Sequence, residues 1–358
     1  MNIALFYGGK SGEHDVSCIS AQYLEKLLIR CDHTVFPVYV SRQGYWYAQE
    51  QVSNKPQFKL NLSNSTFTST NGVSLFLENQ SQKTKIDFIF PIIHGITGED
   101  GSLQGLAQFL NLPYAGCGVL ASAVCMHKKY MNDAFANANL PQPKYLPVTI
   151  SQWRENPQQV IDLALTKLGL PIFSKPCNAG SSVGVTKINS HDDFSEKIAE
   201  SFGYDEDLVL ETGHNIRELE VAIVGKFPNY EVSLAGEVIS NHDFYSYEAK
   251  YLDDEGANFQ IPVSLESGLL EKIQDMARKA FAAVNGEGFA RIDFFQDLDT
   301  QEIFINEINT LPGFTPISMF PKLWQASDIT IESIIEKIID LGLKRNESTK
   351  IPSTTTLS

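Results

Sequence analysis

GFARIDFF at residues 288–295 and EIFINEIN at residues 302–309 are the two stretches that decide how this chain is interpreted. Each alternates polar and apolar residues, which is the period of a half-buried strand. The six residues between them, QDLDTQ, are mostly polar and can form a turn. The pattern therefore predicts that the two stretches pair as an antiparallel hairpin.

The predicted hairpin gathers four polar side chains. Arg291 and Asp293 share one face because they are two residues apart on a strand, and Glu307 and Asn309 do so for the same reason. Carboxylate and amide oxygens suit a magnesium ion that bridges nucleotide phosphates, and a guanidinium suits a substrate carboxylate or a developing oxyanion. The alternative is a solvated hairpin face that carries a salt bridge, and the hairpin alone supports both interpretations.

Composition bounds the class of protein. At 358 residues the chain can form two or three domains, and 43% hydrophobic with 20% charged residues is ordinary for a soluble protein. The formal net charge of −15 argues against nucleic acid or an anionic membrane as the main partner. No apolar run is long enough for a membrane span, and the N-terminus lacks the basic region of a signal peptide. Five cysteines without a Cys-x-x-Cys pair indicate a reduced, cytoplasmic protein.

Residues 1–122 are predicted to form an α/β domain with a doubly wound parallel sheet. Strands are expected at 2–7 and 34–40, with a helix around 15–30 between them. DFIFPIIH at 87–94 is apolar on both faces, as a buried parallel strand would be. The glycine-rich turn GITGEDG and a further helix follow it, and functional loops of such sheets lie at the carboxyl ends of the strands.

Two more domains are predicted, over 123–212 and 213–345. In the first of them the loop NAGSSVG (178–184) connects two strands, so it forms a hairpin and not a strand-to-helix phosphate turn. The other predicted elements are strands at 207–212 and 218–225, an aromatic-rich loop at 240–259, an amphipathic helix at 266–285 and a last helix near 328–343.

Three irregular segments complete the prediction. The loop 240–259 is interpreted as a lid or a packed Ω-loop. The polar segment 50–85 is expected to be a surface excursion, and residues 346–358 are expected to be a disordered tail.

The glycine loop 178–184 is the best candidate for a phosphate site. Its glycines and serines let backbone N–H groups and hydroxyls approach an anion, and Lys175 in the preceding strand supplies a positive charge. The alternative is a plain glycine-rich turn. Gly9-Lys10-Ser11 is not a P-loop, because the first glycine of that motif would fall at Ala4 inside a strand.

Other candidates keep a structural interpretation at this point. These interpretations are a surface lysine for Lys128, edge charges for Glu211 and Glu218, a core histidine for His94 and a helix-initiating acid for Glu13. Cys177 has no histidine or asparagine nearby in the sequence and is interpreted as a packing residue.

Taken together, these stretches resemble the D-alanine–D-alanine ligases of the ATP-grasp superfamily. The resemblance runs from residue 3 to about residue 345. Its segments are FYGGKSGEHDVS, HGITGEDGSLQG, GLPYAGCGVLASA, FSKPCNAGSSVGV, FYSYEAKYLDD, ARIDFF and INEINTLPGFTPISMFPKLW. Each segment is moderately specific, and the set in this order is highly specific.

The resemblance implies a three-domain ATP-grasp fold with ATP between the central and C-terminal domains, and with two Mg²⁺ or Mn²⁺ ions. The nucleotide-binding residues it implies are Lys128, Lys175, Gly180, Ser181, Ser182, Val183, Gly184, Glu211, Glu218 and Lys250. The metal ligands it implies are Asp293, Glu307 and Asn309, which agrees with the hairpin prediction.

The same resemblance implies residues for the two D-alanines. Glu13 would receive the amino group of the first D-alanine, with His94 near the substrate. Arg291 and the Gly313 N–H would hold the oxyanion, and Ser318 would contact the carboxylate of the second D-alanine. Ser181 and Tyr251 would bond across to the Glu13 loop when the lid closes.

The activity implied is ATP-dependent formation of D-alanyl-D-alanine for bacterial peptidoglycan precursors, by a cytoplasmic homodimer. The alternatives are a ligase of this family that uses D-lactate or D-serine as its second substrate, another ATP-grasp carboxylate–amine ligase, and a non-catalytic nucleotide-binding relative. Tyr251 favours D-alanine over D-lactate. The chain departs from the family pattern at His127, where aspartate is usual, and at Ile216, where glycine is usual.

Overall fold

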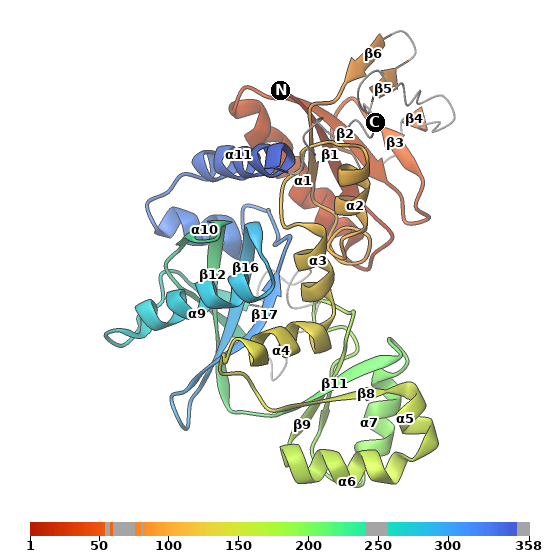
Figure 1. The fold of residues 1–358 in the computed structure, drawn as a ribbon, viewed down its shortest axis with the longest axis vertical. Coiled ribbons are helices and arrows are strands. Elements are labelled where there is room, and N and C mark those ends of the chain that lie inside the picture. Colours follow the sequence, from red (N-terminus) through yellow and green to blue (C-terminus); the bar gives the residue numbers. More distant parts are fainter. Residues whose placement is uncertain (54–57, 60–75, 80–81, 241–256, 349–358) are drawn as a thin grey trace, which may run out of the picture.

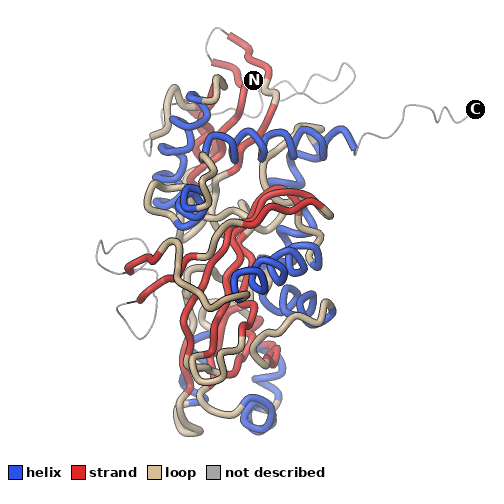
Figure 2. Tube along the Cα trace, turned by 90° about the vertical axis from the view of Figure 1, so that its left-hand side faces the viewer, coloured by secondary structure: helices blue, strands red, loops and turns tan. Residues whose placement is uncertain are grey.

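The computed structural model describes residues 1–53, 58–59, 76–79, 82–240 and 257–348. Three sheets follow one another along the long axis of the molecule, and the sheet that contains β12, β16 and β17 lies in the middle (Figure 1). Figure 2 shows the same order after a turn of 90°. The candidate site is built where the middle sheet meets the other two.

The first sheet has parallel strands at its centre and helices on both faces. Its strands, in order across the sheet, are β4 (Phe58–Lys59), β3 (Trp46–Ala48), β2 (Thr34–Val40), β1 (Asn2–Gly8) and β7 (Phe88–Pro91). β1 pairs in parallel with β2 and β7. α1 (His14–Arg30) and α11 (Ile331–Ser348) pack on one face and α2 (Ser102–Phe109) on the other. The predicted doubly wound parallel sheet is confirmed.

One detail of this part differs from the prediction, and another adds to it. The strand predicted over 87–94 ends three residues early, at Pro91, which is the last residue paired with β1, although the Ile92 N–H still donates to the Phe6 carbonyl at 2.8 Å. The described residues of the polar segment 50–85 include β4 and the two-stranded sheet of β5 (Phe76–Asn79) and β6 (Gln82–Lys85), and the surface excursion stays a prediction.

The second sheet is antiparallel and carries its helices on one face. Its strands, in order, are β10 (Thr186–Ile188), β9 (Ile172–Pro176), β11 (Asp207–Thr212) and β8 (Tyr145–Thr149), and its helices are α5 (Ile150–Glu155), α6 (Pro157–Leu168) and α7 (Phe194–Ser201). The helices bury Ile161, Ala164 and Phe194 against the sheet. β9 and β10 pair as the predicted hairpin around the glycine loop, so the opposite face of the sheet is left for the site.

The third sheet contains the hairpin predicted from the sequence. Its strands, in order, are β15 (Ala257–Gln260), β14 (Gly236–Ser240), β12 (Ile216–Lys226), β16 (Glu287–Asp297) and β17 (Ile303–Asn309), and β13 (Asn229–Val232) also pairs with β12. α3 (Val119–Met126), α4 (Lys128–Asn137) and α9 (Leu269–Ala283) pack on one face, while α10 (Met319–Ala326) and α11 pack on the other. One hydrophobic core joins this second face to the first sheet through Phe90, Phe289 and Phe314.

The last helix extends further than predicted. α11 extends to Ser348, whereas a tail was predicted from residue 346, and the Ser348 hydroxyl donates to the Arg345 carbonyl in the last turn. Residues 349–358 and the greater part of the predicted lid, 241–256, lie outside the described residues. No helix in the described part of the chain is long and apolar enough to cross a membrane. The predicted domain boundaries after 122 and 212 fall within α3 and at the end of β11, and they stay predictions.

Candidate active site

A cavity of about 450 Å³ lies between the second and third sheets. The predicted nucleotide and metal residues that line it are Lys128, Lys175, Gly180, Ser181, Ser182, Glu211, Glu218, Asp293 and Glu307. Three predicted members in the described part of the chain do not line it: Val183 is exposed, Gly184 lies against the ring of Tyr204, and Asn309 lies beside Asp293. The fold thus gathers most of the predicted nucleotide residues in one place.

The hairpin of β16 and β17 forms one wall of this cavity. Asp293 is registered opposite Glu307, and Arg291 opposite Asn309. Arg291 donates to both oxygens of Asp293, at 2.7 Å each, and its Nε lies 2.9 Å from Glu220 Oε2. Asn309 Nδ2 donates to Asp293 at 3.0 Å. The hairpin therefore carries the salt bridge that was the alternative to a metal site.

The donor chemistry of this wall nevertheless fits a hard cation. Asp293 and Glu307 are carboxylates on neighbouring strands that both face the cavity, and the Asn309 amide lies beside them. Such oxygens are the ligands that Mg²⁺ and Mn²⁺ accept. Within the described residues no group of three or more His, Cys, Asp or Glu side chains is arranged to hold a metal ion. Asp293 would have to release Arg291 before both of its oxygens could serve a cation.

Asn306 also lines the cavity, and the alternation of the strand gave no sign of it. A bulge shifts the register between Asp293 and Phe294 of β16. Asp293 pairs with Glu307, but the next residue, Phe294, pairs with Ile305, so Asn306 has no partner in the ladder. The extra residue, Asn306, accepts a hydrogen bond from Lys175 Nζ at 3.4 Å. A β-bulge re-aims a side chain in this way, and strict period-two alternation would have put Asn306 on the far face.

Two lysines stand at the end of the cavity beside the glycine loop. Lys175 Nζ lies 2.6 Å from Glu211 Oε2, and Lys128 Nζ donates to the Ala179 carbonyl at 2.5 Å. Burial lowers the pKa of Lys128, and the charge of Glu307 partly opposes this. Ser181 and Ser182 have φ values of +52° and +59°, which non-glycine residues rarely adopt. Backbone strained in this way can aim successive N–H groups at an anion.

The glycine loop reaches across to the helix that packs on the first sheet. Ser181 Oγ donates to Glu13 Oε1 at 2.6 Å, and Glu13 immediately precedes α1. This is the contact expected for Ser181. Its predicted partner Tyr251, and Lys250, lie outside the described residues.

His94 and the loop that holds Gly313 and Ser318 form a second group beside the cavity. His94 Nδ1 donates to the Leu311 carbonyl at 3.0 Å, and its Nε2 lies 3.2 Å from Ser20 Oγ. Burial lowers the pKa of His94, and the charge of Glu13 opposes this. Ser318 Oγ accepts from the Thr315 N–H at 3.0 Å, and any side chain on Gly313 would crowd Ser318. These three predicted residues do not line the nucleotide cavity.

Glu99 is a candidate that the sequence prediction missed. Its carboxylate accepts from the Gly95 N–H at 2.6 Å and from the Leu311 N–H at 3.1 Å, so it ties the His94 loop to the Gly313 loop. Burial, reinforced by the charge of Glu13, raises the pKa of Glu99 to about 8. The signal was present in GITGEDG, where an acid follows a buried strand by a few residues, but it resembles an ordinary turn acid.

Glu99 should make stability depend on pH. Because its pKa is raised in the folded state, the contribution of the protonated group is fully present below about pH 4.5 and is lost as the pH rises towards about 8. In wild type, the free energy of unfolding should therefore fall between pH 5.5 and 8.5. We expect this fall to be smaller by a few kcal/mol in Glu99→Gln. Urea unfolding at these two pH values measures it. Asp100→Asn, at a neighbouring turn acid, is the control, and equal slopes for wild type and Glu99→Gln would contradict the expectation.

The two departures from the family pattern have different surroundings. His127 precedes α4, with its ring 4.7 Å from that of Tyr130 and its Nε2 3.7 Å from Asp207. His127 does not line the cavity, whereas the adjacent Lys128 does. Ile216 begins β12 and lines the cavity beside Asn215.

Comparison with known proteins gives consistent results along the chain. The family model described as D-ala D-ala ligase N-terminus matches residues 2–117, and the model described as D-ala D-ala ligase C-terminus matches residues 134–340. D-alanine--D-alanine ligase of Geobacillus thermodenitrificans is 41% identical over 352 residues, which are 96% of this chain and 96% of the relative.

Solved structures agree with the sequence relatives. The crystal structure of D-alanyl-alanine synthetase A from Vibrio cholerae superposes with a TM-score of 0.82 and 31% identity, over 96% of this chain and 98% of that one. VanG D-Ala:D-Ser ligase from Enterococcus faecalis superposes with a TM-score of 0.78 and 28% identity, over 95% of this chain and 99% of that one.

Proposed function

The chain belongs to the D-alanine–D-alanine ligase family, and we propose that it joins two D-alanines into D-alanyl-D-alanine with the hydrolysis of ATP to ADP and phosphate. The product is a precursor of bacterial peptidoglycan. The observation that carries the proposal is the hydrogen bond from Ser181 to Glu13. It links the loop over the nucleotide cavity to an acid at the first sheet, where the substrate carboxylate can meet the γ-phosphate.

The residues have separable tasks in this reaction. The carboxylate of the first D-alanine attacks the γ-phosphorus, ADP leaves, and an acylphosphate forms. Lys128 and Lys175 neutralise phosphate charge, and Glu13 holds the ammonium group of the first D-alanine. The amine of the second D-alanine, after losing a proton, attacks the acyl carbon and expels phosphate. Arg291 and the Gly313 N–H stabilise the oxyanion of this step.

The remaining predicted contacts complete the site. Glu211 and Glu218 would hold the adenine and ribose ends of ATP, and Ser318 would receive the carboxylate of the second D-alanine. Asp293, Glu307 and Asn309 would hold Mg²⁺ or Mn²⁺, which neutralises charge on the transferring phosphoryl group when bound. Their support is the hard oxygen chemistry of the cavity wall.

An ADP-release assay over D-amino acids, L-amino acids and D-hydroxy acids tests the proposal. We expect ADP release that depends on D-alanine, with D-alanyl-D-alanine identified by mass. Product that contains D-lactate or D-serine as the main second component would favour the other second substrates. D-serine is included as a second substrate because the similar VanG structure is that of a D-Ala:D-Ser ligase. No ADP release with any D-amino acid would overturn the proposal.

Tyr251 gives a prediction about the second substrate, although it lies outside the described residues. We expect Tyr251→Phe to slow D-alanyl-D-alanine formation and to raise the relative yield with D-lactate, most clearly at lower pH, where the competing amine is protonated. The loss of one hydrogen bond is worth about 0.5–1.5 kcal/mol. Competition between both nucleophiles from pH 6 to 9 measures it. Tyr204→Phe is the matched control, and an unchanged product ratio in Tyr251→Phe would remove Tyr251 from substrate selection.

Two properties of the whole molecule rest on the family and the composition. We expect a homodimer from the family resemblance, and a cytoplasmic location from the odd number of cysteines without a Cys-x-x-Cys pair. Light scattering on a sizing column measures the first of these.

A further inference from the structure

A buried arginine joins the last helix to the crossing between the first and third sheets. Arg345 lies in the final turn of α11, and only 7% of its side chain is exposed. Its guanidinium donates to the Gly116 carbonyl at 2.7 Å and to the Tyr114 carbonyl at 2.6 Å. The guanidinium also lies 3.8 Å from the centre of the Tyr114 ring.

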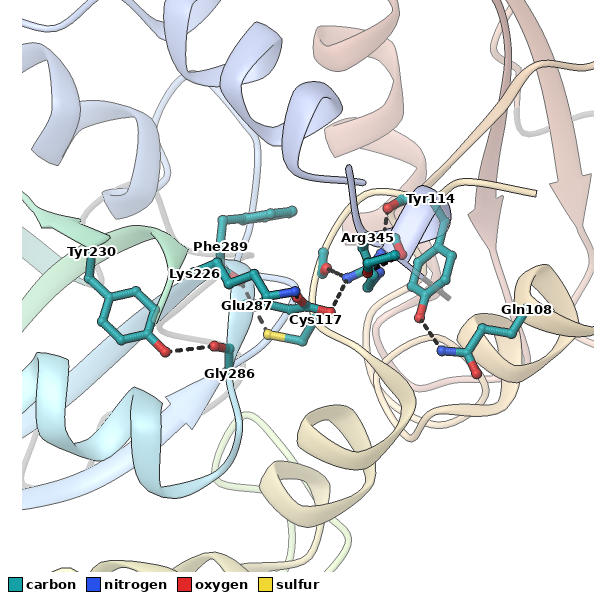
Figure 3. Close-up of polar contacts among 11 residues, drawn as sticks. Gln108, Tyr114, Cys117, Lys226, Tyr230, Gly286, Glu287, Phe289 and Arg345 are labelled. Atoms are coloured by element: carbon teal, nitrogen blue, oxygen red, sulfur yellow. Dashed lines mark hydrogen bonds and ion pairs between the residues drawn. The ribbon is translucent and has the colours of Figure 1, made fainter. Parts of the chain in front are cut away.

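The same arginine forms part of an ion-pair network. Its Nη1 lies 3.4 Å from Glu287 Oε1, while Glu287 Oε2 lies 3.0 Å from Lys226 Nζ (Figure 3). Glu287 begins β16 and Lys226 ends β12. A planar guanidinium can serve two carbonyls and a carboxylate in a fixed fork while it stacks on an aromatic ring, whereas a lysine ammonium is a compact point charge without such a plane.

The segment from Tyr114 to Cys117 is bound on both sides. Tyr114 bridges to Ile89 of β7, so the segment extends the first sheet. Cys117 Sγ donates to the Phe289 carbonyl of β16, in the third sheet. Gly288 has a φ of +90°, and any side chain there would overlap the Gly116 carbonyl. Arg345 therefore fixes the backbone at the point where the two sheets touch.

This crossing lies directly behind the loops that carry the substrate residues. A side chain at Gly116 would meet Leu311 at 3.3 Å. The Leu311 carbonyl accepts a hydrogen bond from His94, and the Leu311 N–H donates to Glu99. β7, to which Tyr114 is bridged, leads into His94. A shift of the Tyr114–Cys117 segment would therefore displace Leu311, and with it a hydrogen-bond partner of both His94 and Glu99.

From these contacts we infer that Arg345 is a positioning residue for the D-alanine site. It holds the Tyr114–Cys117 segment so that the His94 loop and the loop 310–313 keep a fixed separation. This inference rests on the proposed function for the identity of the substrate. None of these partners of Arg345 lines the nucleotide cavity.

Hydrogen–deuterium exchange on the ligand-free chain tests the positioning without activity. We expect Arg345→Met to speed exchange at the Gly95 and Leu311 amides, which donate to Glu99, and to leave residues 172–188 unchanged. Lys344→Met is the control, because Lys344 is the neighbouring helix residue, is exposed and pairs with Asp340. Exchange at Gly95 and Leu311 equal to wild type would overturn the inference.

Kinetics at a temperature well below unfolding give the second readout. We expect the KM for D-alanine to rise about tenfold or more in Arg345→Met and less in Arg345→Lys, because small misplacements of a site are costly. The KM for ATP should be unchanged. A merely structural role would lower the amount of folded protein and leave both KM values alone, which would contradict the inference.

These outcomes stay separate from the proposed function. If wild type releases no ADP with D-alanine, the proposed function fails while the exchange result still tests the positioning. If Arg345→Met does not fold, hydrogen exchange and kinetics are measured on Arg345→Lys and Glu287→Gln instead. Wild-type exchange and wild-type KM values in both of these variants would overturn the inference.

Discussion

A Glu307→Gln variant is expected to turn over about 100-fold or more slowly than wild type. The amide keeps the shape of the side chain and removes its negative charge, and the loss of one preorganised charge contact to a transferring phosphoryl group is worth about that much. Glu307 faces Asp293 across the hairpin and lines the nucleotide cavity. The variant therefore tests whether this wall holds a cation during the reaction.

The same variant has a second expected effect, through Lys128. Burial lowers the pKa of Lys128 and the charge of Glu307 raises it. Removing that charge lowers the pKa of Lys128 further, so the activity of Glu307→Gln should fall at a lower pH than that of wild type. ADP release from pH 6 to 9 at several magnesium concentrations measures both effects. Glu302→Gln, at an exposed acid just before β17, is the control, and near-wild-type rates for Glu307→Gln at ordinary magnesium would sink the metal assignment.

The hairpin could be predicted because its chemistry follows a local rule. Period-two alternation places Arg291 with Asp293 on one face of β16, and Glu307 with Asn309 on one face of β17. The bulge that turns Asn306 into the cavity has no such local signal, since one extra residue in a ladder depends on the partner strand. Glu99 was missed for a related reason. One of its two N–H donors, Leu311, lies 212 residues from Glu99 in the sequence, so the role of Glu99 exists only in the folded chain.

The helix ends show the same limit. The polar residues after 345 predict a tail by composition, yet α11 continues to Ser348. Arg345 anchors that last turn through carbonyls of Tyr114 and Gly116, more than 200 residues earlier in the chain. Tertiary contacts of this kind override local propensity.

An Arg291→Lys variant is expected to form dipeptide about 10²- to 10³-fold more slowly than wild type, which is the usual effect of losing an oxyanion donor. Lysine is chosen because its charge remains near Asp293 and Glu220, so these buried acids are not left without a cation. ATP affinity should be unchanged, because the phosphate lysines are retained. Titration calorimetry with ATP and product analysis by mass measure the two effects. Arg217→Lys is the control, since Arg217 lies on the other face of β12, against Gln296 and Glu237.

The ratio of the two products separates the oxyanion role from a structural one. Both oxygens of Asp293 accept from Arg291, so Asp293 cannot give both to a cation at the same time. Arg291 would then keep its contact with Glu220, and the N–H groups that it withdraws from Asp293 could face the acyl carbon. If that is its task, Arg291→Lys still makes acylphosphate, which water can destroy, so ADP released per dipeptide should rise above one. A variant that loses ADP and dipeptide in equal proportion would instead assign Arg291 to keeping Asp293 in place.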